Sequence, residues 1–182
     1  METHYRGYRF RSRLEARWAV FFDALNISYR YEAEGFKLKS GYFLPDFLLP
    51  DRDIWVEIKP RSFSQFQEEV DRLALLANEL YEATGKEVLC VFGEPYPGEY
   101  SVALVPDLCE SDKTVLQPIY VFALGRRDER ELWLYCENVG AHCLNPLSDD
   151  ERWPLPDHPK LVAAYKKARG ARFEHGEHGT SG

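Results

Sequence analysis

The sequence lacks an apolar run long enough to cross a membrane. The chain has 182 residues, and none of its hydrophobic stretches approaches the ~18–20 residues that a membrane-spanning helix requires. Its first residues, Met-Glu-Thr-His-Tyr-Arg, also lack the apolar core of a secretory signal peptide. Together these absences predict a cytoplasmic protein with no membrane partner.

Cysteine is scarce, with four residues in the whole chain. Four are too few for a disulfide scaffold at this length, so reduced thiols are expected. A zinc site would have to draw on Cys136, His142 and Cys143, with Cys109 as a conceivable fourth ligand. Their spacing differs from the C-x2–4-C pair of structural zinc sites, so buried thiols are predicted instead of zinc.

An excess of basic residues is also missing. The net charge is −7, which argues against a protein that coats nucleic acid. The charge is uneven, since residues 1–62 carry +2, residues 63–160 carry −11 and residues 161–182 carry +2. Overall acidity still allows a nucleic-acid enzyme, because only the docking face has to be basic. The acidic 63–160 segment is a candidate surface for a protein partner.

The chain does contain enough hydrophobic residues, 45%, to build one domain with a core. We expect an α/β fold in which residues 1–125 form the core and residues 126–160 form a β and irregular extension of the same domain. Residues 161–182 are expected to form a basic helix, which starts near Pro159, and a disordered tail.

Two helices are predicted where apolar residues recur at helical spacing. The first covers about 13–25, and Ser12 stands before it as a capping residue. The second covers about 63–84, with Ser62 or Ser64 as its cap and Gly85 directly after it.

A buried strand is predicted at 87–92, after the second helix. The succession of strand, helix and strand implies that this strand lies parallel to the one before the helix, in a mixed sheet. Further strands are predicted toward the C-terminus, at 101–105, 119–124 and 132–135.

Residues 42–59 hold the most unusual pattern in the chain. Two apolar runs flank a Pro50-Asp-Arg-Asp turn, which is typical of a β-hairpin. Asp46, Glu57 and Lys59 interrupt these runs, and alternation places Glu57 and Lys59 on one face of their strand. Because buried charge is costly unless it is paired or bound to metal, this cluster favours a functional site over a solvated face.

Glu15 has two interpretations that the sequence leaves open. It lies three residues after Ser12, as the acidic member of a capping box that closes onto the Ser12 amide. It is alternatively a third carboxylate that the first helix projects toward the hairpin.

Pro45-Asp46, ten intervening residues and Glu57-Ile58-Lys59, with Glu15 on a preceding helix, resemble the PD-(D/E)XK nuclease superfamily. The resemblance covers about residues 5–95 and is nearest to small phage-encoded endonucleases and junction resolvases. It implies a restriction-endonuclease-like core, a mixed central sheet flanked by helices, to which this chain adds C-terminal strands and a C-terminal helix.

The resemblance also implies a Mg²⁺- or Mn²⁺-dependent DNA endonuclease that leaves 5′-phosphate and 3′-hydroxyl ends. Asp46, Glu57 and the carbonyl of Ile58 would bind the metal, and Lys59 would hold or help to deprotonate the attacking water. Glu15 would bind a second metal or orient a metal-bound water. A junction-cutting enzyme needs two active sites, so a homodimer is expected in that case.

Arginines gather just before and within the first helix, at Arg9, Arg11, Arg13 and Arg17. They are candidates for binding DNA phosphates, and a solvated basic face is the alternative. A catalytically silent module that binds nucleic acid or protein on the same fold is the alternative to the nuclease.

Overall fold

The structure is a computed structural model of the full chain. It describes residues 2–97, 102–105, 120–126, 130–136, 140–144 and 154–173. Cys109, His175, His178 and the tail from residue 174 therefore lie outside the described residues, as do the side chains of His142 and Cys143. Within the described residues, none of the helices combines the length and apolar character needed to cross a membrane.

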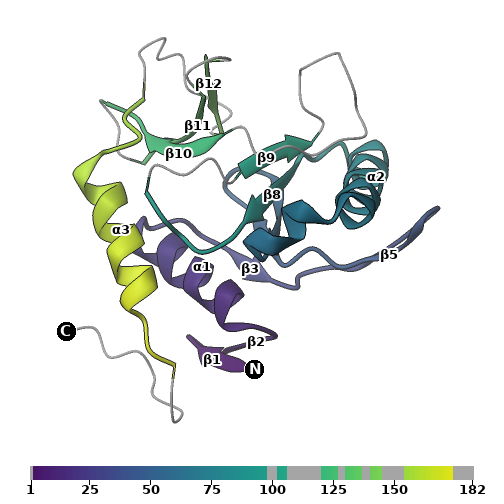
Figure 1. Ribbon diagram of the computed structural model, residues 1–182, viewed down its shortest axis with the longest axis horizontal. Coiled ribbons are helices and arrows are strands. Elements are labelled where there is room, and N and C mark those ends of the chain that lie inside the picture. The colour runs from purple at the N-terminus through teal and green to yellow at the C-terminus, as the bar shows by residue number, and fades with distance from the viewer. Residues whose placement is uncertain are drawn as a thin grey trace.

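The centre of the fold is a mixed sheet whose described strands run in the order β3–β6–β7–β8–β9 (Figure 1). These strands are β3 (Arg30–Tyr31), β6 (Phe47–Leu49), β7 (Ile54–Lys59), β8 (Val88–Phe92) and β9 (Val102–Val105). β7 pairs with β6 antiparallel and with β8 parallel, and β8 pairs with β9 antiparallel. The predicted mixed sheet, with β7 beside a parallel β8, is confirmed.

Smaller sheets surround this centre. They are the hairpin β1 (Thr3–Tyr5) with β2 (Tyr8–Phe10), the hairpin β4 (Phe36–Leu38) with β5 (Gly41–Phe43), and the sheet β10 (Val121–Leu124), β11 (Leu132–Cys136) and β12 (Gly140–Cys143). Residues 42–43 of the predicted hairpin thus belong to a separate pairing, whereas β6 and β7 form the expected antiparallel hairpin around the Pro50–Asp53 turn. The predicted C-terminal strands appear as β9, β10 and β11.

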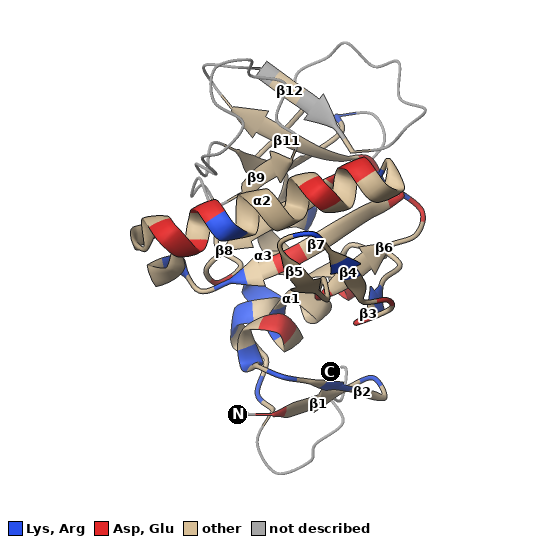
Figure 2. Cartoon of the chain, turned by 90° about the vertical axis from the view of Figure 1, so that its right-hand side faces the viewer, with Lys and Arg blue, Asp and Glu red and all other residues tan. Residues whose placement is uncertain are grey.

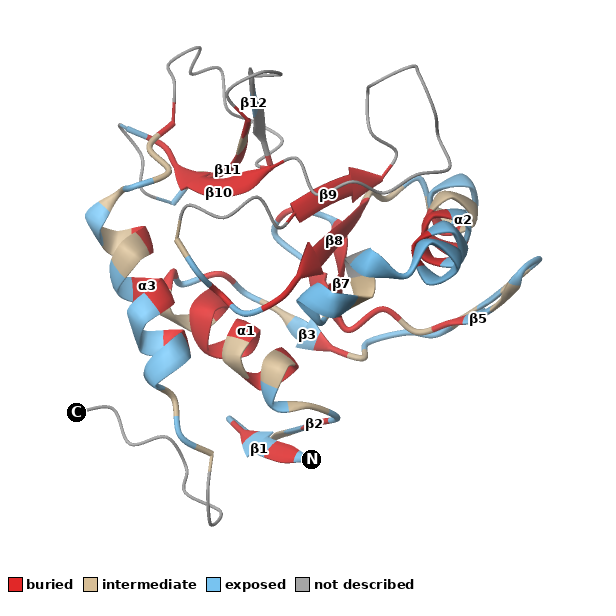
Figure 3. Ribbon diagram, viewed as in Figure 1, coloured by how far each residue is buried: buried red, intermediate tan, exposed pale blue. Residues whose placement is uncertain are grey.

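Helices cover both faces of the central sheet (Figures 1 and 3). They are α1 (Arg13–Ala24), α2 (Gln67–Thr84) and α3 (Pro159–Gly170), and a 3-10 turn, η1 (Arg61–Gln65), precedes α2. Strand side chains alternate between the faces, so Val56 and Ile58 pack in one core with α1 and α3, while Trp55 packs in a second core with α2. Both faces of β7 are therefore buried.

The start of α2 differs from the prediction. Phe66 has an extended backbone, with φ −105° and ψ 92°, and separates η1 from a helix that begins at Gln67. Phe66 occupies the N-cap position of α2 and makes no side-chain cap bond, so neither Ser62 nor Ser64 stands at the predicted cap position. Phe66 and Tyr81 are both exposed, although apolar residues recur at helical spacing through this segment. Gly85 follows the helix as expected.

Candidate active site

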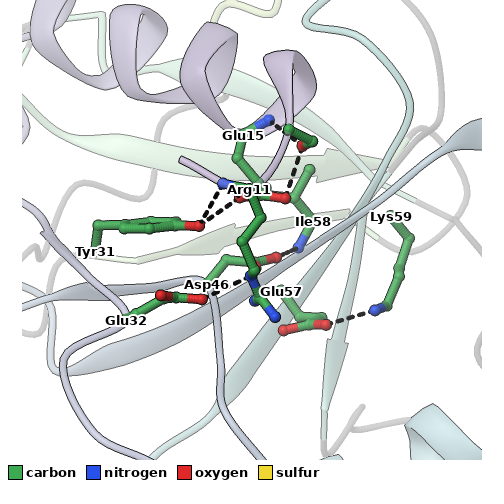
Figure 4. Close-up of polar contacts among 9 residues, drawn as sticks. Arg11, Glu15, Tyr31, Glu32, Asp46, Glu57, Ile58 and Lys59 are labelled. Atoms are coloured by element: carbon green, nitrogen blue, oxygen red, sulfur yellow. Dashed lines mark hydrogen bonds and ion pairs between the residues drawn. The ribbon is translucent and has the colours of Figure 1, made fainter. Parts of the chain in front are cut away.

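Asp46 lies directly before β6, opposite β7. Phe47 pairs with Val56, so continuing the antiparallel register by one residue sets Asp46 against Glu57. The Asp46 side chain is only 4% exposed. Its Oδ2 accepts a hydrogen bond of 2.7 Å from the backbone N–H of Ile58 (Figure 4). The hairpin thus holds the Asp46 carboxylate against the strand that carries Glu57 and Lys59.

Glu57 and Lys59 extend from the face of β7 that α2 covers, as alternation predicts. Lys59 Nζ forms an ion pair of 2.7 Å with Glu57 Oε1. The other carboxylate oxygen, Oε2, is buried and accepts no hydrogen bond from the described residues. A buried carboxylate oxygen without a donor is costly, so this atom is suited to a cation or to a donor on a ligand.

The pKa values of Asp46 and Glu57 also favour a bound cation. Burial, and then the charge of Glu57, raise the pKa of Asp46 well above its ordinary value, although the Ile58 N–H opposes the shift. Burial also raises the pKa of Glu57, against the opposing charges of Lys59 and Arg11. The two carboxylates interact, and the cations around them neutralise their charge incompletely.

Arg11 contacts this cluster from the segment that precedes α1. Its Nη2 lies 2.9 Å from Asp46 Oδ1, and its Nε lies 2.6 Å from Glu32 Oε1. Figure 4 shows the guanidinium between the two carboxylates. The predicted phosphate-binding residue is therefore bound to the acidic site in this structure.

The other three predicted arginines differ from Arg11 in their partners or positions. Arg9 is paired with Glu2, Arg17 is paired with Glu94, and Arg13 is exposed on α1. Figure 2 shows basic residues on α1 and its lead-in and acidic residues along α2. Whether the three arginines contact DNA phosphates stays a prediction.

Glu15 is used as a helix cap in this structure. The Ser12 hydroxyl accepts from the Glu15 N–H at 3.2 Å and donates to Glu15 Oε1 at 2.6 Å. Glu15 Oε2 accepts from the Arg11 N–H at 3.1 Å and from the Tyr31 hydroxyl at 2.6 Å. The carboxylate therefore closes onto the amide of Arg11, not onto that of Ser12. Its charge still raises the pKa of Asp46, so the two groups are near neighbours.

Hydrogen bonds through Gly93 hold the backbone at the end of β7. The Gly93 N–H donates to the Lys59 carbonyl at 2.7 Å, and the Gly93 carbonyl accepts from the Trp18 indole N–H at 2.9 Å. Trp18 is a buried residue of α1. A chain of two hydrogen bonds thus connects α1 to the residue that carries the ammonium group.

The donor set for a metal consists of hard oxygen atoms. Among the described residues, no three Asp, Glu, His or Cys side chains gather closely enough to form a metal site by themselves. Asp46 and the orphaned oxygen of Glu57 supply two carboxylates, which suits Mg²⁺ because this ion binds through one or two carboxylates and keeps several waters. The residues present fit such an ion. The Ile58 carbonyl and Glu15 stay predictions as ligands.

Whether zinc binds stays a prediction, because Cys109 and the side chains of His142 and Cys143 lie outside the described residues. Cys136 is a buried free thiol, as is Cys90, which lies beside Glu57 in the parallel register of β7 and β8. Burial raises the pKa of the Cys90 thiol, so this group is neutral.

A cavity of about 350 Å³ lies against Glu57 and Lys59. Its other walls include Tyr42, Phe43, Phe63 and Arg72. Sequence patterns did not reveal this cavity, nor the roles of Arg11 and Tyr31, since these residues come from segments far apart in the chain.

Comparisons with protein-family models, with curated proteins and with solved structures each returned no match to this chain. No relative therefore lends it a function. The chemistry of Asp46, Glu57 and Lys59 is the basis on which a function can be proposed.

Proposed function

We propose that this protein is a divalent-metal-dependent nuclease that hydrolyses phosphodiester bonds in DNA and leaves 5′-phosphate and 3′-hydroxyl ends. The observation that carries the proposal is the buried, unpartnered Oε2 of Glu57, next to a second buried carboxylate and a paired lysine. A domain has no structural need for such a cluster, whereas a phosphodiesterase needs oxygen ligands beside a cation.

The order of elements supports a restriction-endonuclease-like core. An N-terminal helix precedes an antiparallel hairpin that carries the acidic residues, and α2 then leads to a strand parallel to β7. This is the order that the resemblance to PD-(D/E)XK nucleases implies. The arrangement also brings Asp46 of one strand to the E-x-K segment of the next.

Asp46 and Glu57 would hold Mg²⁺ or Mn²⁺, which would supply positive charge beside the phosphate and lower the pKa of a water. The Ile58 N–H orients Asp46 for this role. Burial lowers the pKa of Lys59, but the adjacent Glu57 carboxylate outweighs it and raises the pKa above its ordinary value. Lys59 is therefore a cation at neutral pH, suited to orienting the attacking water and stabilising negative charge on the phosphate more than to removing a proton.

One observation favours a second candidate, a catalytically silent binding module. Arg11 already neutralises Asp46 in part, and a permanent ion pair of this kind needs no metal. In that case the Arg11 side chain would serve stability alone, and the fold would bind nucleic acid or protein without cutting it.

Cleavage assays separate the two candidates. Supercoiled plasmid, single-stranded DNA and branched DNA are incubated with the protein in Mg²⁺, Mn²⁺ or EDTA. The nuclease cuts at least one substrate with metal and none in EDTA, and Lys59→Ala lowers the rate by about 10²–10³-fold. Lys166→Ala, at an exposed position on α3, is the matched control and retains full activity. If wild type shifts DNA on a gel but cuts none of the substrates, the result would support the binding module and contradict the nuclease.

Metal binding is measured independently by calorimetry with Mn²⁺. Glu57→Gln is expected to abolish the binding, since it replaces the unpartnered carboxylate by an amide. Glu82→Gln, at an exposed position on α2, is expected to leave it unchanged. Equal Mn²⁺ affinity in both variants would contradict the proposed ligand set.

A further inference from the structure

The cavity beside Glu57 and Lys59 has walls that a metal site does not require. Tyr42 and Phe43 come from β5, Phe63 comes from η1 and Arg72 comes from α2. Its volume of about 350 Å³ lies at the small end of the range for organic ligands, ~300–1,000 Å³. Aromatic rings in the wall of a site of this size suit a planar ring as the occupant.

Tyr42 is held in place although it is 65% exposed. A Cβ atom added at Gly35 would lie 1.8 Å from the Tyr42 hydroxyl oxygen and 2.5 Å from its Cζ. The phenol thus occupies the space that a side chain at position 35 would take. The contact with Gly35 restricts the exposed ring before any ligand arrives, and this restriction lowers the entropic cost of stacking against it.

The β4–β5 hairpin that carries Tyr42 is attached to α2. The Ser40 N–H and hydroxyl donate to the Glu79 carboxylate at 3.0 Å and 2.6 Å. A Cβ at the neighbouring Gly41 would lie 3.9 Å from Arg72 Nη2, so the guanidinium is close to the hairpin. Tyr42 and Arg72 therefore border the same cavity in a fixed relation.

The cavity continues directly into the candidate active site. Lys59 Nζ, which pairs with Glu57, lies 5.3 Å from the centre of the Phe63 ring. The charges of the lining balance, since Lys59 and Arg72 face Glu57 and Glu69. A balanced, aromatic lining suits an uncharged ring that is attached to a phosphate better than it suits a free anion.

We propose that this cavity binds one unstacked nucleobase of single-stranded DNA, with Tyr42 and Phe63 as its ring contacts and Arg72 at an adjoining phosphate. The inference rests on the proposed function, because a base reaches the cavity when a neighbouring phosphate of its strand lies at Lys59. Bases in an intact duplex are paired and stacked, so the cavity selects single-stranded or frayed segments.

Binding of labelled 20-residue oligothymidylate is measured by fluorescence anisotropy in EDTA, where no cleavage occurs. Tyr42→Ala is expected to weaken binding about 5- to 100-fold, the range for loss of one stacked base. Tyr81→Ala, at an exposed tyrosine on α2 outside the cavity, is the matched control and is expected to bind like wild type. Gly35→Ala, which displaces the Tyr42 ring, is expected to reproduce part of the loss.

A second oligonucleotide of the same length, made of abasic residues, isolates the base from the backbone. Tyr42→Ala and wild type are expected to bind the abasic strand equally, while Arg72→Ala weakens binding of both strands. Equal losses on both strands for Tyr42→Ala, or no loss on either, would overturn the base site. Thermal unfolding of each variant confirms that it is folded.

The outcomes separate this inference from the nuclease proposal. If wild type cuts DNA but Tyr42→Ala keeps the wild-type ratio of single-strand to duplex cleavage and its affinity for oligothymidylate, the base site is wrong and the nuclease stands. Suppose instead that wild type cuts no DNA with any metal, and that Tyr42→Ala binds oligothymidylate more weakly than wild type but binds the abasic strand equally. The base site then stands and the nuclease proposal is wrong.

Discussion

Arg11 places a positive charge on Asp46 from outside the sheet, while Ile58 fixes the same carboxylate from within it. Within the part of the chain that the structure describes, Glu57 has a partner for one carboxylate oxygen only. At the scale of single residues the site therefore holds two buried acids whose charge is expensive in the absence of a further cation. Replacing one of these acids by its amide should therefore raise the stability of the metal-free protein and weaken metal binding.

Replacing Asp46 by Asn should stabilise the metal-free protein at neutral pH. The pKa of Asp46 in the folded protein lies above the 3.8 of the unfolded chain, so at pH values between these two pKa values the folded state holds a proton that the unfolded state has lost. Wild-type stability from this group is therefore present below pH 3.8 and is lost as the pH rises through the folded pKa. Asp46→Asn removes this loss of stability, because the asparagine side chain does not ionise.

We expect a melting temperature about 2–4 °C higher in EDTA at pH 7.5, corresponding to about 1 kcal/mol at this chain length. The gain should disappear as the pH falls toward 4, and Mn²⁺ should stabilise wild type alone. Thermal unfolding across pH measures this, and a lower melting temperature for Asp46→Asn at pH 7.5 would contradict it.

Removing Arg11 should strengthen metal binding, because its guanidinium competes with a cation for Asp46 Oδ1. Arg11 is about half exposed, so its ion pair is worth ~0.5–1 kcal/mol and Arg11→Ala should lower the Kd for Mn²⁺ about 2- to 5-fold. Arg9→Ala, which removes only a contact with Glu2, is the control in the same titration. A weaker affinity in Arg11→Ala would indicate that the arginine helps to build the site.

At the scale of elements, α1 and the β6–β7 hairpin were predictable because their signals are local. Ser12 and Glu15 stand at the spacing of a capping box, and alternation along β7 fixed which residues share a face. The extended backbone at Phe66 left no such signal, so the start of α2 was misplaced. Arg11 and Asp46 are 35 positions apart, and only the tertiary fold brings them together.

Glu15→Gln distinguishes the cap from a metal ligand. As a cap, Glu15 accepts hydrogen bonds from the Arg11 backbone N–H and from the Tyr31 hydroxyl. Replacing its carboxylate by the glutamine side chain should therefore lower the free energy of unfolding by about 1 kcal/mol, while the Mn²⁺ affinity stays unchanged. Urea unfolding and calorimetry measure the two effects separately. A fall in Mn²⁺ affinity of tenfold or more would instead assign Glu15 to the metal.

At the scale of the whole molecule, the C-terminal helix α3 belongs to the main core. Leu161, Ala164 and Tyr165 are buried with α1, and the ring of Tyr165 lies 4.8 Å from that of Phe21. The sequence predicted the helix from its amphipathic pattern, but not which surface it would cover. Because α1 carries Glu15, whose charge raises the pKa of Asp46, α3 supports a helix that adjoins the site.

Tyr165→Ala should therefore destabilise the whole domain. Truncating a buried aromatic side chain typically costs about 3–5 kcal/mol, and the loss should appear in one cooperative unfolding transition. Lys166→Ala, on the exposed side of the same helix, should change stability by less than about 0.5 kcal/mol. Separate transitions for α3 and for the sheet would show that the helix is an independent unit.

The hydrogen bonds from Lys59 through Gly93 to Trp18 give the protein a built-in optical reporter. The indole N–H of Trp18 donates to a carbonyl whose own residue is bonded to the backbone of Lys59. A shift of Lys59 when metal or DNA arrives alters the polarity around that indole, and hence the wavelength at which Trp18 emits. Emission spectra of wild type and Trp18→Phe would then follow occupancy of the site in real time, without a label on either partner.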